Sequence, residues 1–313
     1  MKILICPLNW GLGHATRCVP IIRQLLEESH EVVIASDGFP LEFLRQQFPE
    51  LRFMNFPSYK ITYSSGKNQV FAMLKSLPAI LTGILREHSQ LNKILKSEHF
   101  DQVISDNRFG LWSKHTHCIY ITHQLMIKMP KGLKWMEPLV RIMHKSIIQR
   151  YNECHIPDFE GIKNLSGDLS HKYPLPQNAK FIGPLSRFKG VKIIPDKEFK
   201  VLCIVSGVEP QRSIFEHNLI EKYQNENFKT LIVCGQPQKE TVEKNVGNVK
   251  LLSHLNDNKL GEYIVGSQNI IARSGYSTLM DLSTLNCLDK AEFIPTPGQT
   301  EQEYLCTLHT TKK

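Results

Sequence analysis

Short apolar runs alternate with segments of helical periodicity along the whole chain. In the first half, runs at 2–6, 31–35, 51–56, 102–105 and 118–122 predict strands, and segments 15–28, 70–96 and 133–149 predict helices. The second half repeats the theme, with strands predicted at 201–206, 230–234, 249–252, 269–272 and 292–295, and helices at 211–223, 258–265 and 277–285. This alternation is typical of parallel sheets covered by helices on both faces, so we predict an α/β fold.

The chain divides near residue 185. Residues 186–197 are basic, low in aromatic side chains and closed by Pro195-Asp196, which is typical of a linker. We therefore predict an N-terminal domain at 1–185, a linker at 186–197 and a C-terminal domain at 198–313. A domain of this kind usually continues with a further strand and helices, so we expect the C-terminal domain to be truncated at its end.

Composition places the chain among soluble globular proteins. Hydrophobic residues make up 41% and charged residues 22% of the 313 residues. No apolar run reaches the roughly 18 residues that a membrane span needs, and the N-terminus lacks the pattern of a signal peptide. The eight cysteines are scattered and lie mostly in strand-like runs, which favours reduced core thiols and a cytoplasmic location.

The positive charge is concentrated in the first half. Residues 1–185 carry 22 Lys and Arg against 15 Asp and Glu, whereas 186–313 carry 16 against 15. Much of the excess lies in 126–151. It includes Lys131, Lys134, Arg141, Lys145 and Arg150 beside an apolar stripe formed by Leu133, Met136, Val140, Met143 and Ile147. We expect this segment to contact an anionic membrane surface; alternatively, the stripe packs on the sheet and the cations are merely solvated. Nucleic acid is not an expected partner, because the basic residues lack interleaved aromatics.

A glycine turn follows the first predicted strand. Gly11 and Gly13 allow a ligand to approach the backbone, and Arg17 lies one turn into the following helix. His14 at the helix start is our candidate general base, because the ordinary pKa of histidine is near 6.5. The alternative is that His14 only caps the helix.

Three turns of the second half have the composition of an anion and sugar site. Backbone N–H groups at a helix start, with hydroxyls beside them, can hold a diphosphate. A carboxylate one turn further on can accept both hydroxyls of a ribose, and an Arg fork can pair with phosphate. The donor-binding candidates are Ser206, Gly207, Arg212, Arg273, Ser274, Gly275, Ser277, Thr278, Asp281, Gln299, Gln302 and Glu303. An ordinary βα turn, a capped helix with a buried Asp281 and a solvated helix end are the alternatives.

Polar residues also follow two strands of the first half, where ligands of open α/β sheets bind. Asp106, Asn107 and Arg108 follow one strand, and His123 and Gln124 follow the next. We take Asp106 as a reserve catalytic base, and we place the other four on the acceptor side with Gly11, Gly13 and Arg17.

These motifs together resemble glycosyltransferases of the GT-B fold, in which two Rossmann-like domains face a cleft. The resemblance is to family 28, the group of the peptidoglycan N-acetylglucosaminyltransferase, and to uncharacterised bacterial sugar transferases. It covers nearly the whole chain. It rests on the segments Gly11-Leu12-Gly13-His14, 105–108, 122–125, 206–212, 273–281 and 295–305.

The resemblance implies an inverting, metal-independent transfer of a sugar from a UDP-type nucleotide sugar to a lipid-linked or glycan acceptor. It also implies that Asp281 holds the ribose, that the 273–278 turn holds the diphosphate, and that Gln302 and Glu303 lie near the donor sugar. No cofactor is expected, since the nucleotide sugar is a substrate. Two rival hypotheses are a nucleotide-sugar hydrolase and a non-catalytic nucleotide-sugar-binding subunit.

Overall fold

The chain forms two compact units, each with its own sheet. The computed structural model describes residues 1–58, 69–237 and 240–310. The first unit contains Met1–Asn9 and Arg17–Leu185, and the second contains Trp10–Thr16 and Ser186–Lys313. The segment predicted as a linker lies within the second unit, where Ser186 and Phe188 are buried.

The sheet of the first unit has seven parallel strands in the order β3-β2-β1-β4-β5-β6-β7. Their bounds are β1 Lys2–Pro7, β2 Glu31–Ser36, β3 Arg52–Asn55, β4 Gln102–Asp106, β5 His117–Ile121, β6 Glu153–Ile156 and β7 Ala179–Phe181. The central strands β1, β4 and β5 are almost wholly buried, as near-continuous apolar runs require in a parallel sheet.

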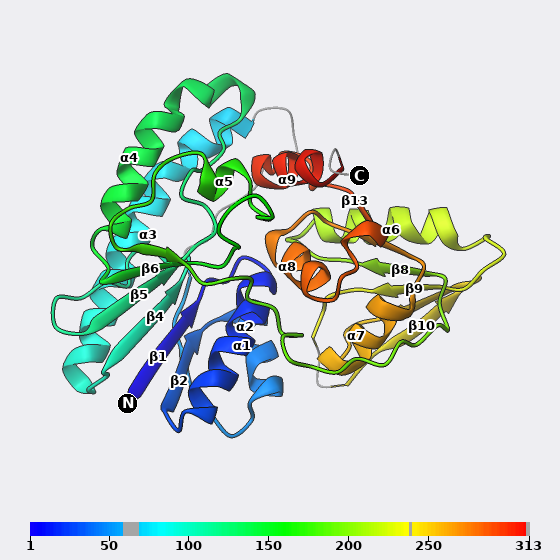
Figure 1. Ribbon diagram of the computed structural model, residues 1–313, viewed down its shortest axis with the longest axis horizontal. Helices are drawn as coiled ribbons and strands as arrows, with labels where there is room; N and C mark the ends of the chain where they lie inside the picture. The colour runs from blue at the N-terminus through cyan, green and yellow to red at the C-terminus, as the bar shows by residue number, and fades with distance from the viewer. Residues whose placement is uncertain (59–68, 238–239, 311–313) are drawn as a thin grey trace. The chain divides into compact units, whose positions relative to one another are not determined.

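Helices cover both faces of this sheet (Figure 1). They are α1 Gly13–Glu27, α2 Gly38–Gln47, α3 Gln69–Ser97, the 3-10 helix η1 Lys131–Met136, α4 Glu137–Ile148 and α5 Asp168–His171. Leu91 of α3 and Ile148 of α4 pack in one core with Leu4, Cys6 and Val103 of the strands. These apolar contacts therefore hold α3 and α4 against the sheet.

The second unit has a six-stranded sheet in the order β10-β11-β9-β8-β12-β13, in which only β10 is antiparallel. The strands are β8 Val201–Ile204, β9 Thr230–Val233, β10 Glu243–Val246, β11 Val249–Leu252, β12 Asn269–Ala272 and β13 Ala291–Phe293. The helices are α6 Gln211–Tyr223, α7 Asp257–Gly266, α8 Tyr276–Thr284, η2 Leu288–Lys290 and α9 Thr300–Thr310. Figure 1 shows α6 on one face of this sheet and α7 and α8 on the other.

The predicted α/β class is confirmed, but several elements were missed. The sequence pattern did not predict helices α2 and α5 or strands β6 and β10. Strand β10 reads Glu243-Lys244-Asn245-Val246 and is mostly exposed at the sheet edge, so it has no apolar run to detect. All eight cysteines are free thiols and seven of them are buried, as the sequence predicted.

Candidate functional site

The predicted donor residues lie on three neighbouring turns of the second unit. Strands β8, β12 and β13 are adjacent and parallel, so the segments that follow them reach the same edge of the sheet. These segments, 206–212, 273–281 and 295–303, are called the donor turns below. The carboxyl edge of an open parallel sheet is where such folds bind ligands.

Arg273 ties the donor turns together. Its Nη1 donates to the carbonyls of Ile294 (3.2 Å) and Pro295 (2.8 Å), and its Nη2 donates to the carbonyl of Gln211 (3.2 Å). The guanidinium is buried and stacks on Phe215 at 4.0 Å, and burial lowers the pKa of Arg273 to about 10. Both terminal nitrogens are thus directed at main-chain carbonyls and position the turns, Nε has no hydrogen-bond partner among the described residues, and pairing of Arg273 with phosphate stays a prediction.

The side chains of the third turn are directed in the same way at the backbone. The Gln302 carbonyl accepts a hydrogen bond from Ser274 Oγ (2.7 Å), and Gln302 Oε1 accepts one from the Thr296 amide (2.8 Å). Gln302 Nε2 donates to Gln299 Oε1 (2.6 Å). Glu303 Oε1 accepts from the Gly298 amide (3.0 Å). These bonds hold the turn after β13 in shape, and the proposed reading of sugar hydroxyls by Gln302 and Glu303 stays a prediction.

Arg212 pairs with two carboxylates, one just before α6 and one within it. Its Nε and Nη1 donate to Glu209 and Glu216, each at 2.6 Å, and Nη1 also donates to the Cys234 carbonyl. The Glu209 carboxylate in addition accepts from the Ser213 amide in the first turn of α6. The sequence suggested Arg212 as a phosphate ligand, but the structure surrounds this helix start with carboxylates, which disfavour an anion.

The N-terminus of α8 has a different character. Gly275 is its N-cap residue, and no side chain caps the helix there. Ser277 and Thr278 lie in the first turn. An uncapped helix start presents backbone N–H groups and the positive end of the helix dipole. Of the donor turns, this one retains the properties of an anion site.

Asp281 lies one turn further along α8 in a buried charge network. Its Oδ1 accepts from Ser186 Oγ (2.7 Å), and its Oδ2 accepts from Arg187 Nε (3.1 Å). Arg187 Nη1 reaches Asp257 at 3.0 Å, so one guanidinium joins α7 to α8. Burial raises the pKa of Asp281, with the Arg187 charge opposing that shift. Each carboxylate oxygen can accept a second hydrogen bond, so the network is compatible with ribose binding, which stays a prediction.

In the first unit, the residues after β4 and β5 form a buried polar cluster. Arg17 Nε donates to Asp106 Oδ2 (2.6 Å), its Nη2 contacts Oδ1, and its Nη1 lies 3.1 Å from His123 Nδ1. Asp106 is fully buried, at 0% exposure. Both oxygens of the Asp106 carboxylate therefore contact Arg17. Asp106 thus orients Arg17, which in turn contacts His123, and the role of Asp106 as a reserve base stays a prediction.

Arg108 is likewise structural. It is buried, pairs with Glu87 (2.8 Å) and donates to the carbonyls of Phe56 and Pro57. Its neighbour Asn107 is half-buried and has a left-handed backbone conformation (φ 56°). Gln124 follows β5, and its backbone N–H donates to Thr122 Oγ1. Asn107 is thus more exposed than Asp106 and Arg108, and its acceptor-side role stays a prediction.

The predicted glycine turn falls in Trp10–Thr16, the segment that groups with the second unit. Gly11 has a φ of 84°, a conformation that favours glycine, and α1 begins at Gly13. His14 is the second residue of α1 and is half-buried. The role of His14 as a base stays a prediction.

Comparison with known proteins places this geometry in context. No family model matches the chain. It is 23% identical to an uncharacterised glycosyltransferase of Methanosarcina mazei over 97% of this chain and 82% of that protein. An uncharacterised glycosyltransferase of Methanosarcina acetivorans is 24% identical over 98% of this chain and 81% of its own length.

Solved structures share the fold at low sequence identity. A spinosyn rhamnosyltransferase matches with a TM-score of 0.60 at 11% identity, covering 100% of this chain and 84% of that one. The glycotransferase of kitacinnamycin matches with a TM-score of 0.59 at 12% identity, covering 99% and 93%. These likenesses support a glycosyltransferase enzyme of the GT-B type.

Among the residues that the structure describes, no group of three or more His, Cys, Asp or Glu side chains is arranged to hold a metal ion. Within the same residues, no helix is both long and apolar enough to cross a bilayer.

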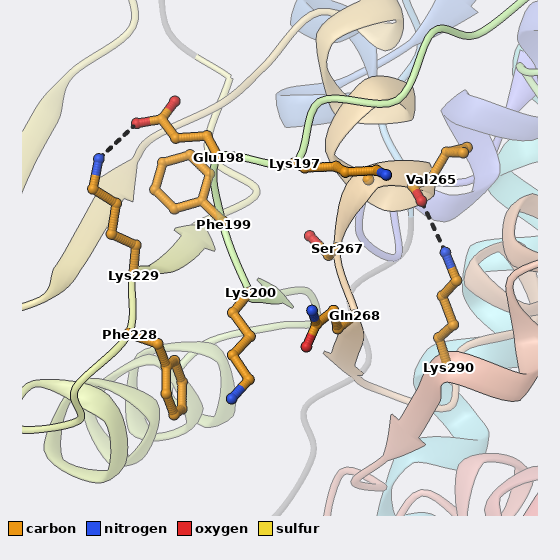
Figure 2. A pocket seen from close by; sticks show the side chains of 11 residues that line it. Lys197, Glu198, Phe199, Lys200, Phe228, Lys229, Val265, Ser267, Gln268 and Lys290 are labelled. Atoms are coloured by element: carbon orange, nitrogen blue, oxygen red, sulfur yellow. Dashed lines mark hydrogen bonds and ion pairs between the residues drawn. The ribbon is translucent and has the colours of Figure 1, made fainter.

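A cavity of about 520 Å³ lies at the opposite edge of the second sheet from the donor turns (Figure 2). Its lining residues immediately precede strands: Lys200 precedes β8, Lys229 precedes β9 and Lys290 precedes β13. Lys229 pairs with Glu198 at 3.5 Å, and Lys290 donates to the Val265 carbonyl near the end of α7. Lys290 thus complements the dipole of α7 at its C-terminal end.

The sequence did not reveal the network around Asp281. Ser186 and Arg187 lie in the segment predicted as a linker, and Asp257 is the first residue of α7. No sequence motif marks these three residues, because they come together only through tertiary contacts between positions 70 to 95 residues apart.

Proposed function

We propose that the chain transfers a sugar, with inversion and without a metal, from a UDP-type nucleotide sugar to a lipid-linked or glycan acceptor. The observation that supports a donor site is the uncapped start of α8 at the carboxyl edge of the second sheet. As the sugar bond breaks, the leaving diphosphate gains negative charge. Backbone N–H groups and the dipole of α8 are placed to stabilise that charge.

The proposal assigns the nucleotide and the acceptor to different parts of the chain. Asp281 holds the ribose, with Arg187 and Ser186 fixing the orientation of its carboxylate. His14 removes the proton of the acceptor hydroxyl. The likeness to family 28 glycosyltransferases in the segments 273–281 and 295–305 supports the choice of a UDP-type donor.

The test uses substitutions in the first turn of α8. Thr278→Asp places a negative charge where the diphosphate is proposed to bind, while an acidic residue in a first turn stabilises the helix. We expect UDP affinity, measured by titration calorimetry, to fall at least about tenfold, with no loss of thermal stability and no change in the weak binding of uridine. Thr278→Val removes the hydroxyl without adding a charge, and it should weaken UDP binding less than Thr278→Asp does. Equal UDP affinity in Thr278→Asp and the parent chain would contradict the donor site.

Turnover separates the proposal from its rivals. A transferase releases UDP from a UDP-sugar only slowly until an acceptor is added, whereas a hydrolase releases UDP and free sugar without one. The structure of a putative UDP-N-acetylglucosamine 2-epimerase of Listeria monocytogenes shares the fold (TM-score 0.53), so nucleotide-sugar chemistry with no acceptor has a structural precedent. UDP binding without any turnover would indicate a binding subunit.

The proposal extends to an anionic membrane surface as the place where the acceptor is met. Around α4, four large apolar side chains are exposed: Trp135 (75%), Leu139, Ile142 and Met143. Lys134, Lys145 and Arg150 are exposed beside them. A helix with exposed apolar residues and a basic margin suits the interface of an anionic bilayer.

This surface differs from the predicted stripe. Leu133 is buried and Met136, Val140 and Ile147 are half-buried, so of the predicted apolar residues only Met143 is exposed. Arg141 stacks on Tyr173 at 4.0 Å instead of extending into solvent, and the side chain of Lys131 lies outside the described residues. Most of the predicted stripe thus faces the sheet, and the exposed apolar face lies on the opposite side of α4.

A further inference from the structure

A hydrogen-bonded chain of side chains links helix α4 to the residue that follows β4. Tyr120 of β5 lies between them: its hydroxyl donates to Asn107 Oδ1 at 3.1 Å and lies 3.2 Å from Nε2 of His144. Tyr120 and His144 are 0% and 3% exposed, so no solvent competes for these bonds. The chain lies entirely within the first unit.

The protons of this chain can be assigned from its chemistry. A tyrosine hydroxyl has a single hydrogen, so if Tyr120 donates to Asn107 it must accept from His144. Burial lowers the pKa of His144 to about 4, which leaves the ring neutral near pH 7 with one N–H. Donation from Tyr120 to Asn107 requires that hydrogen on Nε2, which makes the order of donation His144 to Tyr120 to Asn107. Phe109 packs edge-on against the same imidazole, with the ring centroids 5.4 Å apart, and fixes its orientation.

The consequence for Asn107 is a fixed amide. Its Oδ1 accepts from Tyr120 and from Thr122 Oγ1 (3.4 Å), and its backbone amide donates to the Ile121 carbonyl (3.0 Å). The left-handed backbone of Asn107 and these bonds leave its Nδ2 group directed away from the buried chain. Among the described residues no hydrogen bond of that NH₂ group is found, although the side chain is half-buried.

We propose that Tyr120 and His144 are positioning residues that fix the Asn107 amide as a hydrogen-bond donor to a hydroxyl of the acceptor. This inference rests on the proposed transferase function. It gives the buried face of α4 a role, because the helix that exposes Leu139 and Ile142 outward holds the acceptor-side amide through His144 on its inner side. A preorganised donor costs less entropy to engage than a mobile one.

The first experiment needs no substrate. The side-chain order parameter of the Asn107 NH₂ group is measured by ¹⁵N NMR in the unliganded chain. We expect about 0.85 in the parent protein and below about 0.6 in Tyr120→Phe and in His144→Leu. His144→Gln retains an N–H near the position of Nε2 and is expected to keep the parent value. An unchanged order parameter in Tyr120→Phe overturns the positioning role.

The second experiment measures function. Transfer from a UDP-sugar is followed with phosphatidylglycerol vesicles that contain diacylglycerol as the hydroxyl-bearing probe. Tyr120→Phe, His144→Leu and Asn107→Asp should each lower the rate of transfer about tenfold, while the Kd for UDP stays within about twofold. His144→Gln, which keeps an N–H near the position of Nε2, should transfer at about the parent rate. Tyr223→Phe, which removes a buried hydroxyl of the second unit, is the control and should change neither quantity.

The two arms separate the inference from the function on which it rests. If UDP binds and Asn107→Asp transfers at the parent rate, the role of the amide as a donor is overturned. If the chain shows neither UDP binding nor transfer, the proposed function fails, and the NMR arm still decides whether Tyr120 and His144 position Asn107.

Discussion

Arg187 offers the sharpest test of how the second unit is held together. One guanidinium lies between two carboxylates, 3.0 Å from Asp257 and 3.1 Å from Asp281, and all three side chains are close to buried. Burial by itself lowers the pKa of Arg187, but the two carboxylates more than offset that effect and raise it. Arg187→Met keeps an unbranched side chain of similar volume but removes the charge. Two buried carboxylates then remain without a compensating cation.

The expected cost follows from that geometry. Removing one partner of a buried ion pair costs about 3–5 kcal/mol, and here a single substitution affects two pairs. For a unit of this size the loss corresponds to a fall in Tm of roughly 10–20 °C. Differential scanning calorimetry is the assay, because it resolves the unfolding of two units if they melt separately. Lys250→Met, which breaks the surface pair with Glu243, is the matched control and should cost no more than about 1 kcal/mol.

The pH dependence of the variant gives a second check. Burial raises the pKa of Asp281, so between the unfolded and folded pKa values the native state binds more protons than the unfolded chain. The stability contributed by this group therefore falls as pH rises through that window. Loss of Arg187 raises the folded pKa further, and acidification should narrow the difference in Tm between the variant and the parent.

Asp281→Asn combined with Arg187→Met removes one of the two stranded charges, so the double variant should recover part of the lost stability. A single Arg187→Met variant that melts within about 2 °C of the parent at neutral pH would refute the reasoning, since the carboxylates would then be compensated by other groups.

The remaining predictions concern the nucleotide, the acceptor, the membrane and acid stability. Asp281→Ala should weaken UDP binding by roughly 1–3 kcal/mol in calorimetry, and unchanged affinity in a folded variant would refute ribose binding. His14→Ala should lower turnover by about 10²-fold with donor affinity preserved, whereas a parent-like rate would leave His14 as a helix cap. Trp135→Glu with Leu139→Glu should abolish co-sedimentation with phosphatidylglycerol vesicles but not alter UDP affinity; equal weak binding of the parent to anionic and neutral vesicles would argue against a membrane surface. Because burial lowers the pKa of His144 to about 4, the parent should lose stability as pH falls from about 6.5 towards 4, where only the unfolded chain takes up the proton, and His144→Leu should lose less.

Much of the architecture is readable from the sequence because it depends on local periodicity. The apolar run of β12 and the helical spacing of α6 were predicted with the bounds observed, Asn269–Ala272 and Gln211–Tyr223. Strands buried on both faces are continuous apolar runs, and helices that cover them repeat at 3.6 residues, so each element carries its own signal. The carboxyl-edge placement of the donor turns follows from the same parallel order.

The roles of individual charged residues were decided only by the tertiary structure. Arg273 and Arg212 are residue types that bind phosphate, yet Arg273 donates to main-chain carbonyls and Arg212 pairs with the carboxylates of Glu209 and Glu216. Asp106 meets Arg17 across 89 positions of sequence, and Asp281 meets Arg187 across 94. Hydrophobic periodicity is a property of neighbouring residues, whereas the partner of a charge is whichever group the fold brings within about 3 Å, and no local pattern encodes that choice.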